Sequence, residues 1–80
     1  MKAVKDAIAQ INPDEQYRPR EIQDIHPFLG EYLKPHTVYR MIRERDQLDA
    51  VDVSTSDKWP MYLIDGDELI STLKSIYDVQ

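Results

Sequence analysis

The spacing of the apolar residues changes from a helical period to a strand period near residue 50. Val38, Met41 and Ile42 are spaced i, i+3, i+4, which predicts the buried face of a helix. Val51 and Val53 alternate with a polar residue, which predicts a strand. Apolar residues at helical spacing return after residue 66. This order of periods predicts an α+β domain that is mainly α-helical.

The length and the absence of cysteine limit the architecture further. Eighty residues allow one domain with one small core, and no disulfide bond or thiolate metal site can stabilise it. We therefore expect a single domain over 1–80. Its expected parts are an accessory N-terminal helix over 1–12, short helices over 17–48, a β-hairpin over 50–64 and a C-terminal helix over 66–78.

Prolines divide the first half of the chain. Asn12-Pro13 is expected to end the N-terminal helix. Pro19 and Pro35 suit the first position of a helix, so further helices are expected over 19–25 and 35–45. The segments between them are expected to be a polar turn or a short helical start over 14–16 and a short helical turn with a connector over 28–33.

The hairpin and the last helix carry their own signals. Residues 59–64 are the expected returning strand, and the polar residues 54–58 are the expected tip. Asp65 is expected to cap the C-terminal helix, because Glu68 stands three residues on, as in a capping box. The N-terminal helix is amphipathic, and its apolar stripe either completes the core or forms a dimer or partner surface.

The charge is distributed unevenly along the chain. The whole chain carries −5. Residues 17–45 hold six Lys or Arg and four Asp or Glu, for a net of +2, and the rest of the chain has a net of −7. An acidic protein can still bind a polyanion through one local cationic face.

The helix expected over 35–45 has such a face. His36, Arg40 and Arg43 are spaced i, i+4, i+7 on the side opposite its apolar residues. This face either is a solvated helix surface or contacts an anionic partner. The DNA major groove admits one α-helix, and arginine can form two hydrogen bonds to guanine there. Thr37 in the first turn, and Arg18 and Arg20 near the start of the preceding helix, are expected to contact phosphates or base edges.

The chain resembles the MerR-like and phage excisionase-like helix-turn-helix proteins over residues 17–74. The resemblance rests on the ordered segments PREI (19–22), TVYRMIRE (37–44), LDAV (48–51) and YLIDGDEL (62–69). It implies a winged helix-turn-helix over 17–48 with a two-stranded β-hairpin wing and the additional N-terminal helix. The chain differs from the family pattern in having about five extra residues between Ile22 and Thr37 and a wing with few basic residues.

In that family the equivalent of helix 35–45 enters the major groove and the wing touches the DNA backbone or minor groove. The resemblance therefore implies DNA contacts from Lys34, His36, Thr37, Arg40 and Arg43, and from the wing tip, including Ser56 and Lys58. It implies a sequence-specific DNA-binding protein of the excisionase or transcription-regulator type, from a phage or mobile element. A homodimer or a cooperative array would supply affinity that a single small module lacks.

The alternative function is an acidic interaction module or phage-type inhibitor that binds a basic protein partner. We expect no enzyme and no cofactor, because the chain has no nucleophile elbow, no phosphate-binding glycine loop and no acid–base pair. His26 and His36 have no neighbouring acidic or thiol cluster, so no metal site is expected. No apolar run approaches the roughly 20 residues of a membrane span, and the N-terminus lacks a secretory signal, so we expect a cytoplasmic protein without membrane contact.

Overall fold

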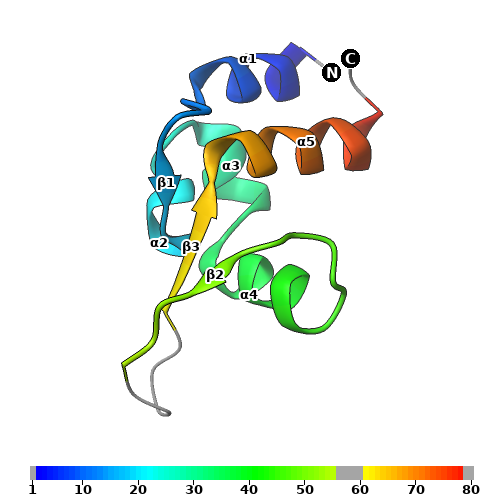
Figure 1. Ribbon diagram of the computed structural model, residues 1–80. Helices are drawn as coiled ribbons and strands as arrows, with labels where there is room; N and C mark the ends of the chain where they lie inside the picture. Colours follow the sequence, from blue (N-terminus) through cyan, green and yellow to red (C-terminus); the bar gives the residue numbers. More distant parts are fainter. Residues whose placement is uncertain (1, 56–60, 79–80) are drawn as a thin grey trace.

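The computed structural model describes residues 2–55 and 61–78 (Figure 1). The protein is α+β and mainly helical. The helices are α1 (Lys2–Gln10), α2 (Pro19–Ile22), α3 (Pro27–Tyr32), α4 (Pro35–Arg43) and α5 (Gly66–Tyr77). The strands are β1 (Gln16–Tyr17), β2 (Val51–Asp52) and β3 (Tyr62–Asp65). Within these described ranges, no helix has the length and apolar content needed to cross a bilayer.

The strands form an antiparallel sheet in the order β1-β3-β2. β2 and β3 are the predicted hairpin, although part of its connection lies outside the described residues. β1 was not predicted, since Gln16 was expected in a turn or helical start and two residues are too short to show a period. It forms because Tyr17 pairs with Ile64 and is buried. The sheet therefore has one more strand than the two-stranded hairpin that we expected.

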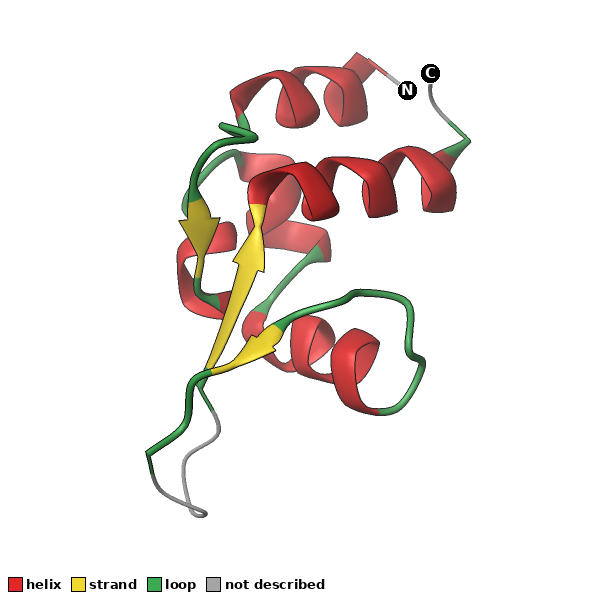
Figure 2. Cartoon of the chain, viewed as in Figure 1, coloured by secondary structure: helices red, strands yellow, loops and turns green. Residues whose placement is uncertain are grey.

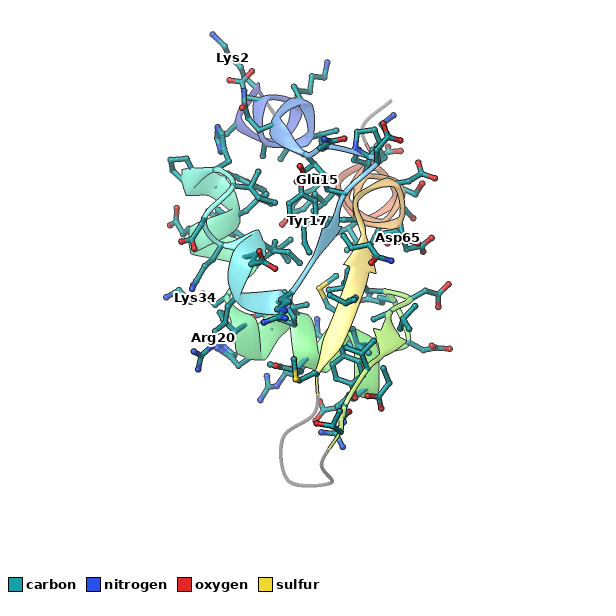
Figure 3. All side chains as sticks on the ribbon, turned by 60° about the vertical axis from the view of Figure 1, so that its left-hand side comes forward. Lys2, Glu15, Tyr17, Arg20, Lys34 and Asp65 are labelled. Atoms are coloured by element: carbon teal, nitrogen blue, oxygen red, sulfur yellow. The ribbon has the colours of Figure 1, made fainter. Side chains whose placement is uncertain are left out.

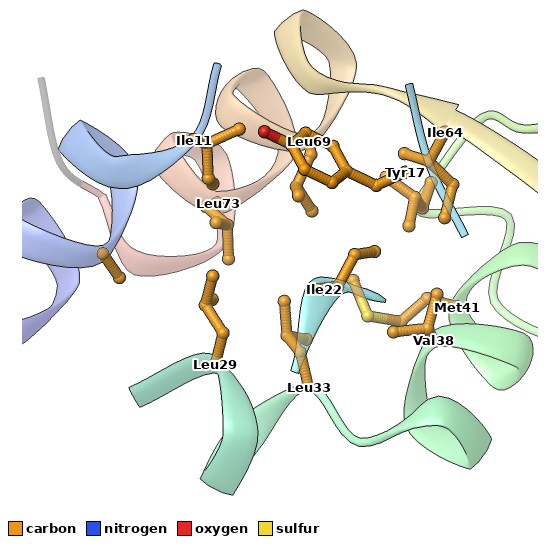
Figure 4. Close-up of a cluster of buried hydrophobic side chains, with 12 residues drawn as sticks. Ile11, Tyr17, Ile22, Leu29, Leu33, Val38, Met41, Ile64, Leu69 and Leu73 are labelled. Atoms are coloured by element: carbon orange, nitrogen blue, oxygen red, sulfur yellow. The ribbon is translucent and has the colours of Figure 1, made fainter. Parts of the chain in front are cut away.

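The core lies between the sheet and the helices. Figure 2 shows α2, α3 and α4 behind the strands, with α1 and α5 side by side at one end. Figure 4 shows the buried side chains converging from all of these elements. They are Ala7, Ile11, Tyr17, Ile22, Leu29, Leu33, Val38, Met41, Leu48, Ile64, Leu69 and Leu73. Val4 and Ala7 of α1 are buried, so the stripe of the N-terminal helix completes the core.

α2 and α4 both end earlier than predicted. α2 stops at Ile22 instead of residue 25, and the next residues form turns in which the amides of Asp24 and Ile25 donate to the carbonyls three residues earlier. His26, the residue before Pro27, is extended, as expected before a proline. His26 caps α3, with its Nδ1 accepting a hydrogen bond from the Phe28 amide at 3.1 Å. α4 stops at Arg43 instead of residue 45, and Asp46 then adopts the left-handed conformation with φ of 50°.

The predicted capping box at α5 is wrong in its side-chain contacts. Asp65 occupies the N-cap position, but its carboxylate makes no capping hydrogen bond to the helix. It accepts a hydrogen bond from Gln16 Nε2 at 3.0 Å instead. Asp65 therefore joins β1 to β3 through a side-chain contact between residues far apart in the sequence.

Gly66, directly after Asp65, is required by a close approach of two backbone segments. A Cβ atom at this position would collide with the carbonyl oxygen of Asn12. The Gly66 amide also donates a hydrogen bond to the carbonyl of Glu15 at 2.8 Å. The start of α5 is therefore held against the segment that connects α1 to β1.

Candidate nucleic-acid interface

α4 has one face in the core and one face in solvent. Val38 and Met41 are buried, and Ile42 is half-buried against the core. His36, Arg40 and Arg43 are exposed on the other side. Because the apolar face anchors α4 to the core, the cationic face has a defined direction relative to the rest of the protein.

The start of α4 adds further groups to this face. Lys34 is the N-cap residue and Pro35 occupies the first turn, where its missing N–H costs no helical hydrogen bond. The Lys34 ammonium cannot accept a hydrogen bond, so it does not cap the helix and its side chain is exposed. Thr37 lies in the same turn and is half-buried.

The chain's own carboxylates neutralise this face only weakly. Arg40 Nε lies 4.0 Å from Glu44 Oε2, and these side chains are 62% and 70% exposed. An exposed pair at i, i+4 is worth only about 0.3–0.5 kcal/mol. Asp52 also lies near Arg43, but hydrogen bonds from Ser54 are the largest cause of its lowered pKa, and Arg43 lowers that pKa less. Both guanidinium groups remain open to solvent.

Arg18 and Arg20 lie beside α4, at the start of α2. Both are exposed, and both line an open groove of about 660 Å³ whose walls include Tyr39 of α4 and Tyr62 of β3. Figure 3 shows Arg20 and Lys34 pointing outward on the same side of the molecule. α2 and α4 therefore contribute basic side chains to neighbouring parts of one surface.

Glu21 lowers the positive charge of this groove. It lines the same groove, and its carboxylate accepts a hydrogen bond from the Arg18 amide at 2.9 Å. A helix N-terminus attracts an anion, and here the chain supplies that anion itself. Any phosphate contact in this region would come from the arginine side chains.

Tyr39 connects the two groups of arginines, and the sequence reasoning did not select it. Its ring centroid lies 5.8 Å from that of Tyr62. It also lines a second groove, of about 390 Å³, together with Arg40, Arg43 and Glu44. On the helical wheel Tyr39 falls at the border between the apolar and basic faces, and that position in a basic helix was the available signal.

The hairpin is only partly described. Ser56 and Lys58, predicted to contact DNA, lie outside the described residues. Ser54 is half-buried, and its hydroxyl and amide both donate to the Asp52 carboxylate. Ser54 therefore stabilises the end of β2 rather than offering a free hydroxyl group to a ligand.

The histidines occupy separate positions. His26 caps α3, and His36 is on the exposed face of α4. In the part of the chain that the structure describes, no three His, Asp or Glu side chains converge to hold a metal ion.

Comparisons with protein-family models, with curated proteins and with solved structures gave no match.

Proposed function

We propose that this protein is a small sequence-specific binder of double-stranded DNA, and that α4 inserts into the major groove. In this proposal α2 to α4 form a helix-turn-helix and the β2–β3 hairpin is the wing of a winged-helix fold. Its role is that of an excisionase-like protein or a transcriptional regulator of a phage or mobile element. It acts in the cytoplasm, where such DNA is accessible.

One observation carries the proposal. α4 presents Arg40 and Arg43 to solvent while Val38 and Met41 hold its other face in the core. A helix used for reading base edges needs this combination, because its side chains must be exposed and its axis must be fixed. We expect Arg20 and Lys34 to contact the phosphates that flank such a helix, and such contacts set orientation rather than sequence preference.

The size of the protein bears on its affinity. A single module of this kind buries about 600–1,000 Å² of protein surface on DNA. The net charge of −5 also makes non-specific binding weak. Useful affinity therefore requires more than one copy on the DNA, as a dimer or an array.

The test begins with selection of bound sequences from a random double-stranded DNA library. Fluorescence anisotropy then measures the Kd of the selected site for the wild type and for Arg40→Ala with Arg43→Ala. We expect this double variant to raise the Kd about tenfold or more, because one bidentate arginine contact discriminates by about 1–3 kcal/mol.

The matched control is Lys2→Ala with Lys5→Ala, which removes the same charge from exposed positions of α1. We expect this control to change the Kd much less. Equal losses of affinity in the two double variants would contradict the proposal, and so would a selection that enriches no sequence.

A second candidate function is binding of a basic protein partner through the acidic surface at the β3–α5 junction. Asp49, Asp65 and Glu68 line a groove of about 140 Å³ there. A partner bound in this way would stay bound to the Arg40→Ala, Arg43→Ala variant. It would be released when Asp49→Asn and Glu68→Gln remove two of the carboxylates.

A further inference from the structure

The sheet has an outer face that carries a row of apolar side chains. Leu63 pairs with Val51, and the amide of Val53 donates to the carbonyl of Met61 at 2.8 Å. Paired residues on neighbouring strands point to the same face, and successive residues alternate between faces. These four side chains therefore share the face opposite to buried Ile64.

This apolar row is open to solvent. Val51 is 54% exposed, Val53 and Met61 are each 36% exposed, and Leu63 is half-buried. The helices α2, α3 and α4 pack behind the strands, on the other face of the sheet (Figure 2). The described part of the chain thus leaves the centre of the outer face without a covering element. A contiguous exposed apolar surface is a common sign of an interaction site.

Groups of opposite charge flank the apolar row. Arg18 continues β1 in extended backbone, with φ of −84° and ψ of 155°, and it lines a groove together with Met61 and Leu63. On the other flank, Asp49 lines the groove at the β3–α5 junction together with Val51 and Leu63.

Asp65 and Glu68 line the same groove as Asp49, at the β3–α5 junction. Glu21 lies on the basic flank and lowers its positive charge. Asp49 and Glu68 supply the carboxylates of the other flank, because the Asp65 carboxylate accepts a hydrogen bond from Gln16 of β1, which lines the basic groove.

We propose that a second copy of this chain docks on this outer sheet face. A two-fold axis that lies in the plane of the contact and runs along the apolar row turns the face onto itself and exchanges its two flanks. The acidic flank of each copy then meets the basic flank of the other, and the two apolar rows meet in the centre. An isologous dimer requires a self-complementary surface of this kind.

The proposed dimer does not rest on the proposed DNA binding. α4 packs behind the sheet, so docking through the outer face leaves Arg40 and Arg43 of both copies exposed. In this dimer Arg18 contacts the partner copy. Arg20 and Lys34 point outward together, away from this contact (Figure 3). The mass of the protein in solution tests the dimer without any DNA.

The experiment is sedimentation equilibrium of the full chain at protein concentrations from about 10 μM to 1 mM, the range in which weak homodimers form. The wild type is expected to change from monomer to dimer mass. Val51→Glu places a charge in the apolar centre and is expected to remain monomeric. Ile76→Glu is the control, because Ile76 is 44% exposed on α5 and lies outside this face. It is expected to dimerise like the wild type, and circular dichroism verifies the fold of each variant.

A charge exchange tests the pairing of the flanks. Arg18→Glu alone and Asp49→Arg alone are each expected to raise the dimer Kd about tenfold or more, and the two changes together are expected to restore dimerisation. A wild type that is monomeric throughout, or a Val51→Glu variant that dimerises normally, overturns the proposal. A combined variant as monomeric as the single ones overturns the two-fold arrangement.

Discussion

The ring centroids of Tyr39 and Tyr62 lie 5.8 Å apart with their planes at 60°, and this contact joins α4 to β3. Both residues are half-buried, and both line the groove that contains Arg18 and Arg20. The contact sets the position of the basic helix relative to the hairpin. The surface proposed to meet DNA therefore depends on an aromatic pair as well as on its arginines.

Tyr39→Ala is expected to lower the free energy of unfolding by about 1–2 kcal/mol, because it removes an aromatic pair worth about 0.5–1.5 kcal/mol beyond its buried area. Urea unfolding followed by circular dichroism measures this change. Tyr39→Phe keeps the ring and serves as the control, with an expected loss below about 0.5 kcal/mol. An alanine variant as stable as the phenylalanine variant would show that the ring contact does not stabilise the fold.

Gly66→Ala is expected to destabilise the protein by about 2 kcal/mol or more, because the new Cβ atom collides with backbone at Asn12. The same unfolding measurement tests it. Ser71→Ala, at an exposed position of α5, is the matched control and is expected to be neutral or slightly stabilising, because alanine favours a helix. If Gly66→Ala also stabilised the protein, the close approach of α5 to Asn12 would be refuted.

His26→Ala is expected to cost about 1 kcal/mol of stability, because it removes the side-chain cap of α3. His26→Asn supplies another side-chain acceptor at the same position and is expected to recover most of this loss. Thermal or urea unfolding measures the stability of the wild type and of these two variants. Equal stability of the alanine and asparagine variants would argue against capping by His26.

The carboxyl of Asp52 is expected to titrate below its ordinary pKa of 3.8, chiefly because the Ser54 hydroxyl and amide donate hydrogen bonds to it. The pKa is lower in the folded chain than in the unfolded one. Ionised Asp52 therefore favours folding above the ordinary pKa, and this contribution is lost as the pH falls through the lowered value.

Ser54→Ala is expected to move the pKa of Asp52 back toward 3.8, because the hydrogen bond from the Ser54 hydroxyl is the largest cause of the lowered pKa. An NMR titration that follows the Asp52 carboxyl carbon measures the shift. Thr55→Ala, at the exposed neighbouring position, is expected to leave that pKa unchanged. A pKa of Asp52 that is the same in the wild type and in Ser54→Ala would disprove the role of this hydroxyl.

The elements whose apolar residues repeat with a clear helical period were predicted well. The buried face of α4, its exposed basic face and the helix after residue 66 all follow from apolar spacing. These features are local, because a helix of this kind buries whichever side carries its apolar residues. The starts of α2 and α4 at Pro19 and Pro35 were predicted for a local reason as well, since proline suits the first helical turn. The start of α3 at Pro27 has the same cause but was not predicted.

The remaining features depended on partners distant in the sequence. β1 forms because β3 lies beside it. The Asp65 carboxylate accepts a hydrogen bond from Gln16 on the neighbouring strand instead of capping α5 as predicted. The contact of Tyr39 with Tyr62 arises in the same way.

Amino-acid order alone therefore determined where α2 and α4 start, that a helix follows residue 66 and which side of α4 is basic, because backbone sterics and apolar spacing act within a few residues. Only the folded chain decided the third strand, the aromatic contact and the opposite charges flanking the apolar row of the outer sheet face. Each of these requires residues from separate segments to meet, and the sequence does not record which segments will be neighbours.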